Sequence, residues 1–257
     1  MRDEDKAKCV ERTVIAFHGK QRVKEFYLKR LRAHRTADQL RQHFEYWSKD
    51  GEDGLFRGCA LGCTLHSGDY AAYEAELGIP SVLALLEDGI FESLPSARAM
   101  AWPEEFLSAI RPGADLKAVW PQFAYWLLVD PEYGLMQFAE RNKTKESVQK
   151  VGHLYKRWID GEKIGDDEFT AAYAFAFAAA SVSVFGTGDA YAARATTYAA
   201  AAAYAYANAA GAANVACEAT VEPAKWRKAQ ADKLLALMAS APISELELDR
   251  SLVYCSE

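Results

Sequence analysis

Apolar side chains recur at steps of three and four residues along most of the chain, which is the spacing of one face of an α-helix. The pattern is longest over residues 21–48, where it predicts one amphipathic helix with charges on its other faces. His34 falls on the apolar face of this helix and is expected to be a core histidine. No alternation of period two extends beyond a few residues. The pattern therefore predicts an all-α fold, an irregular multi-helix bundle, with residues 243–257 as an irregular tail or a strand.

Capping residues and prolines divide the chain into further helices. Asp69 is expected to cap a helix over residues 70–77, with Gly78 in the left-handed stop position. Pro80 suits the first turn of the next helix, and Pro95 ends it. Later helices are expected to begin at or near Pro103, Asp115, Asp130, Thr144 and Pro223.

The C-terminal half contains an unusual run of alanine and aromatic residues. Half of residues 171–214 are alanine, the strongest helix former, and tyrosine and phenylalanine alternate with it. A break at residues 185–189, with Asp189 as the expected cap of a second helix, predicts an Ala/Tyr-rich helical hairpin. Residues 169–188 and 195–217 carry no charge, so a membrane hairpin is the alternative. Because leucine and isoleucine are absent from both stretches, a buried hairpin is the expectation.

Length and composition indicate a globular protein that needs no disulfide or metal for stability. The 257 residues are 51% hydrophobic and 26% charged. The charged residues 142–147 predict a soft boundary between a helical N-terminal part (1–142) with the Cys/His loop and an Ala/Tyr-rich helical C-terminal part (143–257), unless the two form one continuous domain. The five scattered cysteines and the charged N-terminus favour reduced thiols and a cytoplasmic location.

Charge is distributed unevenly along the chain. The net charge of −6 makes nucleic-acid binding an unfavoured function. Residues 20–41 nevertheless hold eight lysines or arginines against two acids, whereas residues 74–105 hold seven acids against one arginine. The two segments either neutralise each other or leave a basic surface for an anionic partner. In the second case Arg30 and Arg35 are candidate ligand-binding residues.

Candidate chemistry is densest in residues 58–69, within a loop that five glycines predict over residues 49–69. Cys59, Cys63 and His66 follow the spacing C-x3-C-x2-H. Thiolate and imidazole ligands suit zinc, although this spacing is not a common zinc pattern. Zinc would also need a fourth ligand from elsewhere. The candidates for it are His18, His43 and His153.

Other interpretations of the same segment stay open. Cys63 could be a nucleophile with His66 as its base, which makes these two the candidate catalytic residues. Gly62, Ser67 and Asp69 could instead line an anion site built from backbone N–H groups. The segment could also simply pack onto the core, because cysteine is commonly buried. The adjacent acids Glu87 and Asp88 are expected on a solvated helix face.

Three parts of the sequence together resemble an uncharacterised group of bacterial and phage-borne helical proteins. They are the cysteine–glycine segment, residues 73–80 (YEAELGIP), and the Ala/Tyr hairpin followed by Trp226 and residues 232–235 (DKLL). The resemblance covers about two-thirds of the chain. It implies a cytosolic protein of mobile-element origin and transfers no activity or functional residue.

Two functions follow as hypotheses. The first is a soluble helical binding or interaction protein, whose partner is another protein or a small anionic ligand and not a membrane. The second is an enzyme that uses residues 58–69, through a bound metal or through Cys63. The charge asymmetry and the lack of a complete catalytic motif favour the first, whereas the density of ligand-type side chains favours the second.

Overall fold

The computed structural model describes residues 14–43, 47–48, 56–203, 205 and 207–244. Within these residues the fold is all-α, as expected: twelve α-helices, two short 3-10 helices, and one two-stranded antiparallel ribbon of β1 (Trp47–Ser48) and β2 (Arg57–Gly58). The helices are α1 (Gln21–Thr36), α2 (Ala60–Leu65), α3 (Tyr70–Leu77), α4 (Ser81–Ser93), α5 (Ser96–Ala99), α6 (Trp102–Ala109), α7 (Val119–Val129), α8 (Asn142–Ile159), α9 (Asp166–Ser181), α10 (Gly188–Ala201), α11 (Asn208–Cys217) and α12 (Pro223–Ser240). The 3-10 helices are η1 (Ala16–Gly19) and η2 (Leu135–Phe138).

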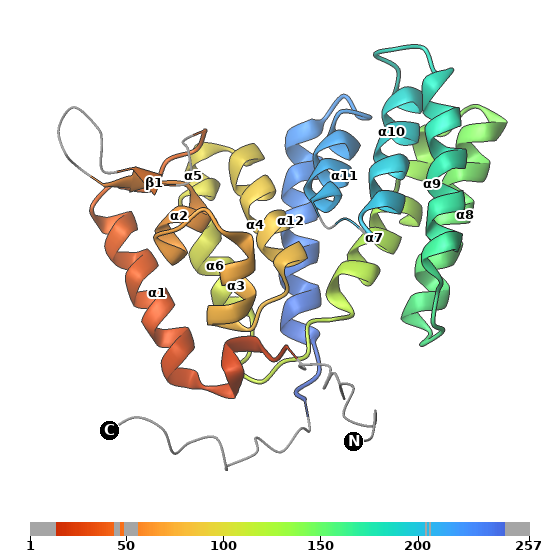
Figure 1. The fold of residues 1–257 in the computed structure, drawn as a ribbon. Helices are drawn as coiled ribbons and strands as arrows, with labels where there is room; N and C mark the ends of the chain where they lie inside the picture. The colour runs from red at the N-terminus through yellow and green to blue at the C-terminus, as the bar shows by residue number, and fades with distance from the viewer. Residues whose placement is uncertain (1–13, 44–46, 49–55, 204, 206, 245–257) are drawn as a thin grey trace, which may run out of the picture.

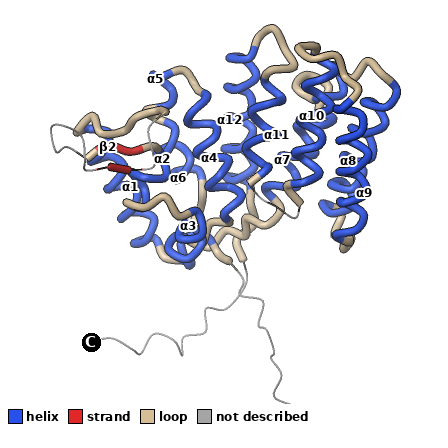
Figure 2. The backbone as a smooth tube through the Cα atoms, turned by 45° about the horizontal axis from the view of Figure 1, so that its top comes forward, coloured by secondary structure: helices blue, strands red, loops and turns tan. Residues whose placement is uncertain are grey.

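The helices form two groups joined by a central layer (Figure 1). Helices α1 to α6 lie on one side, and α7 to α10 lie on the other. Between them, α12 packs against α4 and α6 on one side and α7 on the other, while α11 packs against α4 and α10. Figure 2 shows the same order from a second direction. The residues expected to form a soft boundary, 142–147, are the first turns of α8. The division into two domains stays a prediction.

Helix ends that are set by local chemistry fall where the sequence predicts them. Asp69 caps α3 by accepting a hydrogen bond from the Ala71 N–H at 2.8 Å, and Gly78 ends it with φ 62°. A Cβ on Gly78 would lie 2.0 Å from the Ile15 carbonyl oxygen, so only glycine fits. Pro80 immediately precedes α4. The apolar face of α4 and its C-terminal cap is buried: Leu83, Leu86, Ile90 and Leu94. Pro103 and Pro223 lie in the first turns of α6 and α12, as predicted.

The single helix predicted over residues 21–48 is wrong. Helix α1 ends at Thr36, and the chain turns at Asp38, whose backbone has φ 54° and whose carboxylate pairs with Arg41. Leu40 is nevertheless buried, because it forms a parallel bridge with Gly58. Its position in the apolar pattern therefore reflects burial in the core and not continuation of the helix. Residues 44–46 of this pattern lie outside the described residues.

The loop predicted over residues 49–69 is also wrong in part. Residues 49–55 lie outside the described residues, but Ala60–Leu65 form α2, with Gly62 in its interior. All six residues of α2 are buried. Burial against α1, α3 and α4 therefore outweighs the low helix propensity of glycine.

The Ala/Tyr-rich segment contains the expected hairpin, in which α9 packs against α10, but a third helix follows within the same run. After α9 and α10 the chain turns, and α11 begins at Asn208. The cap of α10 is Thr187, whose Oγ1 accepts from the Ala190 N–H at 3.2 Å, and not the predicted Asp189. No helix in the described part of the chain is long and apolar enough to cross a membrane.

Three other predicted helix starts need correction. The Asp115 carboxylate accepts a bond from the Lys117 N–H, but α7 begins only at Val119. Asp130 ends α7 and holds a turn by accepting from the Glu132 and Tyr133 N–H groups. Thr144 lies inside α8, which begins two residues earlier.

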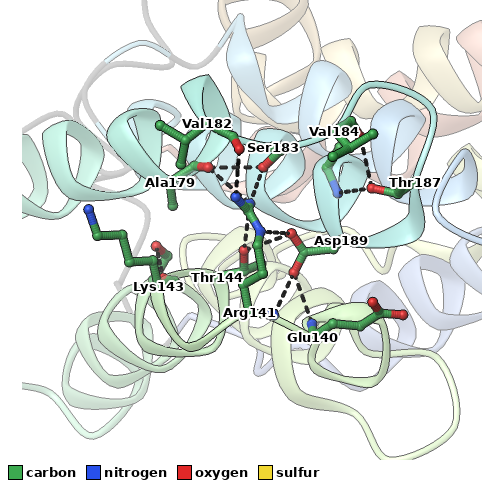
Figure 3. A network of polar contacts seen from close by, with 12 residues as sticks. Glu140, Arg141, Lys143, Thr144, Ala179, Val182, Ser183, Val184, Thr187 and Asp189 are labelled. Carbon is green, nitrogen blue, oxygen red and sulfur yellow. Dashed lines mark hydrogen bonds and ion pairs between the residues drawn. The ribbon is translucent and has the colours of Figure 1, made fainter.

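Asp189 instead belongs to a buried polar cluster that joins three helix ends (Figure 3). Its Oδ1 accepts from the N–H groups of Glu140 and Arg141 at 2.9 and 3.0 Å, just before α8 begins. Its Oδ2 pairs with the Arg141 guanidinium and accepts from Thr144 Oγ1 at 3.1 Å. The same guanidinium donates to the carbonyl oxygens of Ala179 and Val182 at the end of α9. We call this cluster the Arg141–Asp189 clamp.

Replacing Asp189 with alanine should lower the free energy of unfolding by about 2–3 kcal/mol, because the half-buried guanidinium of Arg141 and two backbone N–H groups lose their acceptor. Asp189→Asn should cost less, since a carboxamide oxygen still accepts. Asp166→Ala, an exposed acid in the first turn of α9, should cost under about 1 kcal/mol. Urea unfolding measures all three. Equal losses for Asp189→Ala and Asp166→Ala would contradict a stabilising clamp.

The clamp also predicts a pH dependence. Burial raises the pKa of Asp189, but the hydrogen bonds from Arg141, Glu140 and Thr144 outweigh it and hold the pKa below its ordinary value. The ionised clamp is therefore fully stabilising above the unfolded-state pKa, near 3.8, and this contribution is lost as pH falls through the lower folded-state value. The difference in unfolding free energy between wild type and Asp189→Asn should shrink over that acid range.

Candidate functional site

The two cysteines of residues 58–69 are buried on α2 and its N-terminal cap. Cys59 precedes α2, and its Sγ accepts from the Gly62 N–H at 3.5 Å. Cys63 lies within α2 with its Sγ 3.4 Å from the Gly58 carbonyl oxygen. His66, at the other end of α2, has φ 59°, and its Nε2 lies 2.8 Å from His34 Nε2. His34, expected in the core, is thus only partly buried and paired with a second histidine.

The thiol environments do not favour nucleophilic chemistry. Burial raises the pKa of Cys63 to about 12, and the neighbouring Glu87 adds to the effect. Burial and Asp88 also raise the pKa of Cys59. A nucleophilic cysteine needs a lowered pKa, so these are the surroundings of packed, unreactive thiols. The catalytic role of Cys63 and His66 stays an untested prediction.

The predicted zinc ligands are not gathered around one point. Among the described residues, no group of three or more His, Cys, Asp or Glu side chains could hold a metal ion. Of the candidate fourth ligands, His18 Nε2 lies 3.1 Å from the carbonyl oxygens of Ala75 and Glu76. Zinc bound by Cys59, Cys63 and His66 stays a prediction.

The residues expected to bind an anion all make contacts inside the protein. Gly62 is buried within α2. Ser67 Oγ accepts from the N–H of Asp69, and the Asp69 carboxylate caps α3. Arg30 donates to the Thr64 carbonyl oxygen at 2.8 Å and lies over the ring of Phe26, 4.7 Å from its centroid. Arg35, together with Arg32, pairs with Glu104, so here the basic and acidic segments meet. None of these contacts tests a ligand role.

The prediction that Glu87 lies on a solvated helix face is wrong, because its side chain is 0% exposed. Tyr73 Oη donates to Glu87 Oε2 at 3.0 Å, while Oε1 has no hydrogen-bond partner among the described residues. Burial, with a contribution from the charge of Asp88, raises the pKa of Glu87 well above its ordinary value. Burial therefore favours the protonated form of this carboxyl group. Sequence carries a signal for this burial, since position 87 lies four residues after Leu83 and three before Ile90 on the apolar face.

A pocket of about 390 Å³ lies elsewhere, between α9, α10 and α11. This volume falls in the range of small-molecule sites. We call it the α9–α11 pocket. Three aromatic, three polar and two small side chains line it: Tyr173, Phe177 and Tyr198; Arg194, Thr197 and Asn208; Ala180 and Ala201.

The walls of the pocket follow from the Ala/Tyr sequence. Tyr173 and Phe177 are one turn apart on α9, and their rings stack with centroids 6.0 Å apart and an interplanar angle of 22°. Tyr198 lies against α11 at Gly211, where a Cβ would come within 3.4 Å of its ring. The alanines between these rings are too small to fill the space that the rings enclose.

Arg194 supplies a positive charge to the α9–α11 pocket. Its guanidinium is 6.0 Å from the centroid of the Tyr191 ring. Within the part of the chain that the structure describes, it forms no ion pair or hydrogen bond. A guanidinium carries five N–H donors in a planar fork that matches carboxylate, sulfonate or phosphate oxygens. The pocket therefore offers an unpaired, half-buried cation beside three aromatic rings.

Comparison with known proteins adds nothing to this geometry. No family model matches the chain, and neither a curated protein nor a solved structure matches it. The candidate site must therefore be judged on its own residues. In the sequence these aromatic residues are expected only as part of a buried hairpin, and the charge pattern indicates Arg30 and Arg35 instead of the isolated Arg194.

Glu87→Gln should make the protein more stable at neutral pH. Gln cannot ionise, whereas burial favours protonated Glu87 in the folded chain and the unfolded chain ionises it near its ordinary pKa of 4.5. Wild type and variant should unfold with similar free energies below this pH. Above it the variant should gain about 1.4 kcal/mol per pH unit, up to the raised folded-state pKa. Glu25→Gln, on the exposed surface of α1, is the control, and a parallel gain in it would refute the assignment.

The buried thiols should be inert in the folded protein. In a Cys9→Ser/Cys255→Ser background, Cys59, Cys63 and Cys217 should react with a disulfide reagent at neutral pH only as fast as the protein unfolds. Burial raises the pKa of Cys217 to about 11, so it serves as an internal reference. A fast phase that disappears in Cys63→Ser would instead favour the nucleophile hypothesis.

Proposed function

We propose that this protein binds a small anionic ligand with a planar apolar body in the α9–α11 pocket. The observation that carries the proposal is the guanidinium of Arg194, which has no ion-pair or hydrogen-bond partner among the described residues and lines the same pocket as the stacked rings of Tyr173 and Phe177. Taking a guanidinium partly out of water costs free energy that an anion in the pocket would return. The chemical class is therefore an aromatic or other flat carboxylate, sulfonate or phosphate.

The aromatic side chains support the apolar half of this ligand. Tyr173, Phe177 and Tyr198 provide flat faces on which a planar ring can stack, at a low cost in side-chain entropy. Phe177 is 55% exposed, so part of its ring is accessible to a ligand in the pocket. Thr197 and Asn208 add polar groups that can orient the ligand.

The proposal keeps the binding hypothesis that the sequence favours and changes its location. The anion site expected at Arg30 and Arg35 lies on α1, whereas Arg194 lies on α10. Burial of Cys59 and Cys63 gives the alternative, an enzyme using residues 58–69, no support from thiol reactivity. A mobile-element origin stays part of the proposal, resting on the resemblance alone.

Two fluorescent probes that differ in charge test the proposal. Anilinonaphthalene sulfonate is flat and anionic, and phenylnaphthylamine has the same ring system without the sulfonate. Arg194→Gln should weaken sulfonate binding by about tenfold to a hundredfold, because a charge-assisted hydrogen bond contributes about 1.5–3 kcal/mol. It should leave phenylnaphthylamine binding unchanged. Titrations followed by fluorescence give both dissociation constants.

Two further variants serve as controls. Arg22→Gln removes the same charge from the exposed surface of α1 and should alter neither probe. Ala180→Leu fills the pocket and should weaken both probes without lowering the melting temperature. If Arg194→Gln and Arg22→Gln change sulfonate binding equally, or if neither probe saturates on wild type, the proposed site is wrong.

A further inference from the structure

We infer that His34 and His66 form a binding site for a divalent transition-metal ion with tetragonal or octahedral geometry. Their Nε2 atoms lie 2.8 Å apart and approach each other from two different elements, α1 and the C-terminal end of α2. The site shares only His66 with the zinc ligands that the sequence suggests, and it is independent of the α9–α11 pocket.

The hydrogen bonding of His34 prepares its Nε2 as a ligand. Its Nδ1 lies 2.7 Å from the side-chain oxygen of Gln39. Because a carbonyl oxygen only accepts, Nδ1 must carry the proton, and in the neutral ring Nε2 then presents its lone pair. Metal-binding histidines are held in this way, with the other ring nitrogen donating to an oxygen. Gln39 is itself fixed by backbone bonds to His34 and Gly58.

His66 occupies a backbone position that normally favours glycine. It ends α2 in the left-handed conformation, with φ 59°, and its N–H bonds to the Gly62 carbonyl oxygen at 2.8 Å. The equivalent position after α3 is Gly78. A histidine with positive φ costs free energy that glycine would avoid, and such strain concentrates at functional sites. Unlike glycine at this position, His66 places an imidazole against His34.

Phe56 holds the two rings in this arrangement. Its ring centroid lies 4.6 Å from that of His34 and 5.3 Å from that of His66. His66 is exposed, so water can fill the remaining coordination positions of a bound ion. The pair is therefore held by packing against Phe56, and His66 is reachable from solvent.

The separation of the nitrogens selects the geometry of the ion. Two nitrogens about 2.0 Å from one metal lie roughly 2.9 Å apart when the angle at the metal is a right angle, and roughly 3.3 Å apart in a tetrahedron. The observed 2.8 Å matches the nitrogen separation of the right angle, and because the ring centroids are 5.0 Å apart the two Nε2 atoms point at each other, so both rings must turn slightly to bind an ion. Imidazole ligands at right angles suit Ni²⁺ or Cu²⁺ better than tetrahedral zinc. The same distance also fits a proton shared by the two rings, so the experiment must distinguish a metal site from a hydrogen bond between the histidines.

Calorimetric titration of untagged protein with Ni²⁺, which does not oxidise the thiols as Cu²⁺ does, tests the inference. Wild type should bind one Ni²⁺ per chain, and its melting temperature should rise with Ni²⁺. His66→Gly should weaken binding by at least about tenfold, since even an outer partner of a metal ligand contributes that much. This variant removes the imidazole and relieves the left-handed strain together, so it should fold at least as well as wild type. Melting without metal checks that.

His153→Asn, on the exposed face of α8, is the matched control and should bind Ni²⁺ like wild type. Paramagnetic Ni²⁺ should also broaden the ring proton signals of His34 and His66 before those of the other histidines. No saturable binding to wild type, or equal binding by wild type and His66→Gly, would mean that the two rings only share a proton and would overturn the inference.

Discussion

Three helix ends meet at the Arg141–Asp189 clamp, and the C-terminal half of the fold depends on that contact. Helices α9 to α11 are rich in alanine, which buries little apolar area per residue, so packing alone fixes their relative positions weakly. The clamp adds directional bonds between the start of α8, the end of α9 and the start of α10. It also satisfies backbone groups that helix ends leave without partners.

The shape of the α9–α11 pocket depends on the Arg141–Asp189 clamp. Tyr173 and Phe177 lie on α9, and Arg194 lies on α10, so their separation is set by how the two helices pack. The clamp joins the end of α9 to the start of α10 just beyond the short connection between them. Because the clamp fixes α9 and α10 at one end, the two helices do not need to move together to fill the space that their small alanine side chains leave at the pocket.

Local signals in the sequence predict only some of the helix ends of this protein, and they predict the side-chain partners poorly. Asp69 and Gly78 determine where α3 begins and ends because each acts on backbone groups within four residues. Asp189, by contrast, has cap chemistry, but its acceptor oxygens serve Arg141, 48 residues away. His34 and His66 are 32 residues apart, and nothing in either local pattern indicates that their rings meet. Distances of this kind depend on packing, which a single sequence does not display.

The high alanine content has two opposite consequences, close packing of helices and an unfilled pocket. As a helix former with a small side chain, it allows close approach of α9 and α10, which the sequence does predict. Ala180 and Ala201, however, line the pocket together with three aromatic rings, and their side chains are too small to fill the space between the helices. The same composition therefore also produces a pocket. Arg194, which pairs with no acid among the described residues, adds a positive charge to the lining of this hollow. A composition that suggests only a close-packed hairpin therefore also contains the elements of a binding site, once large and small side chains face each other.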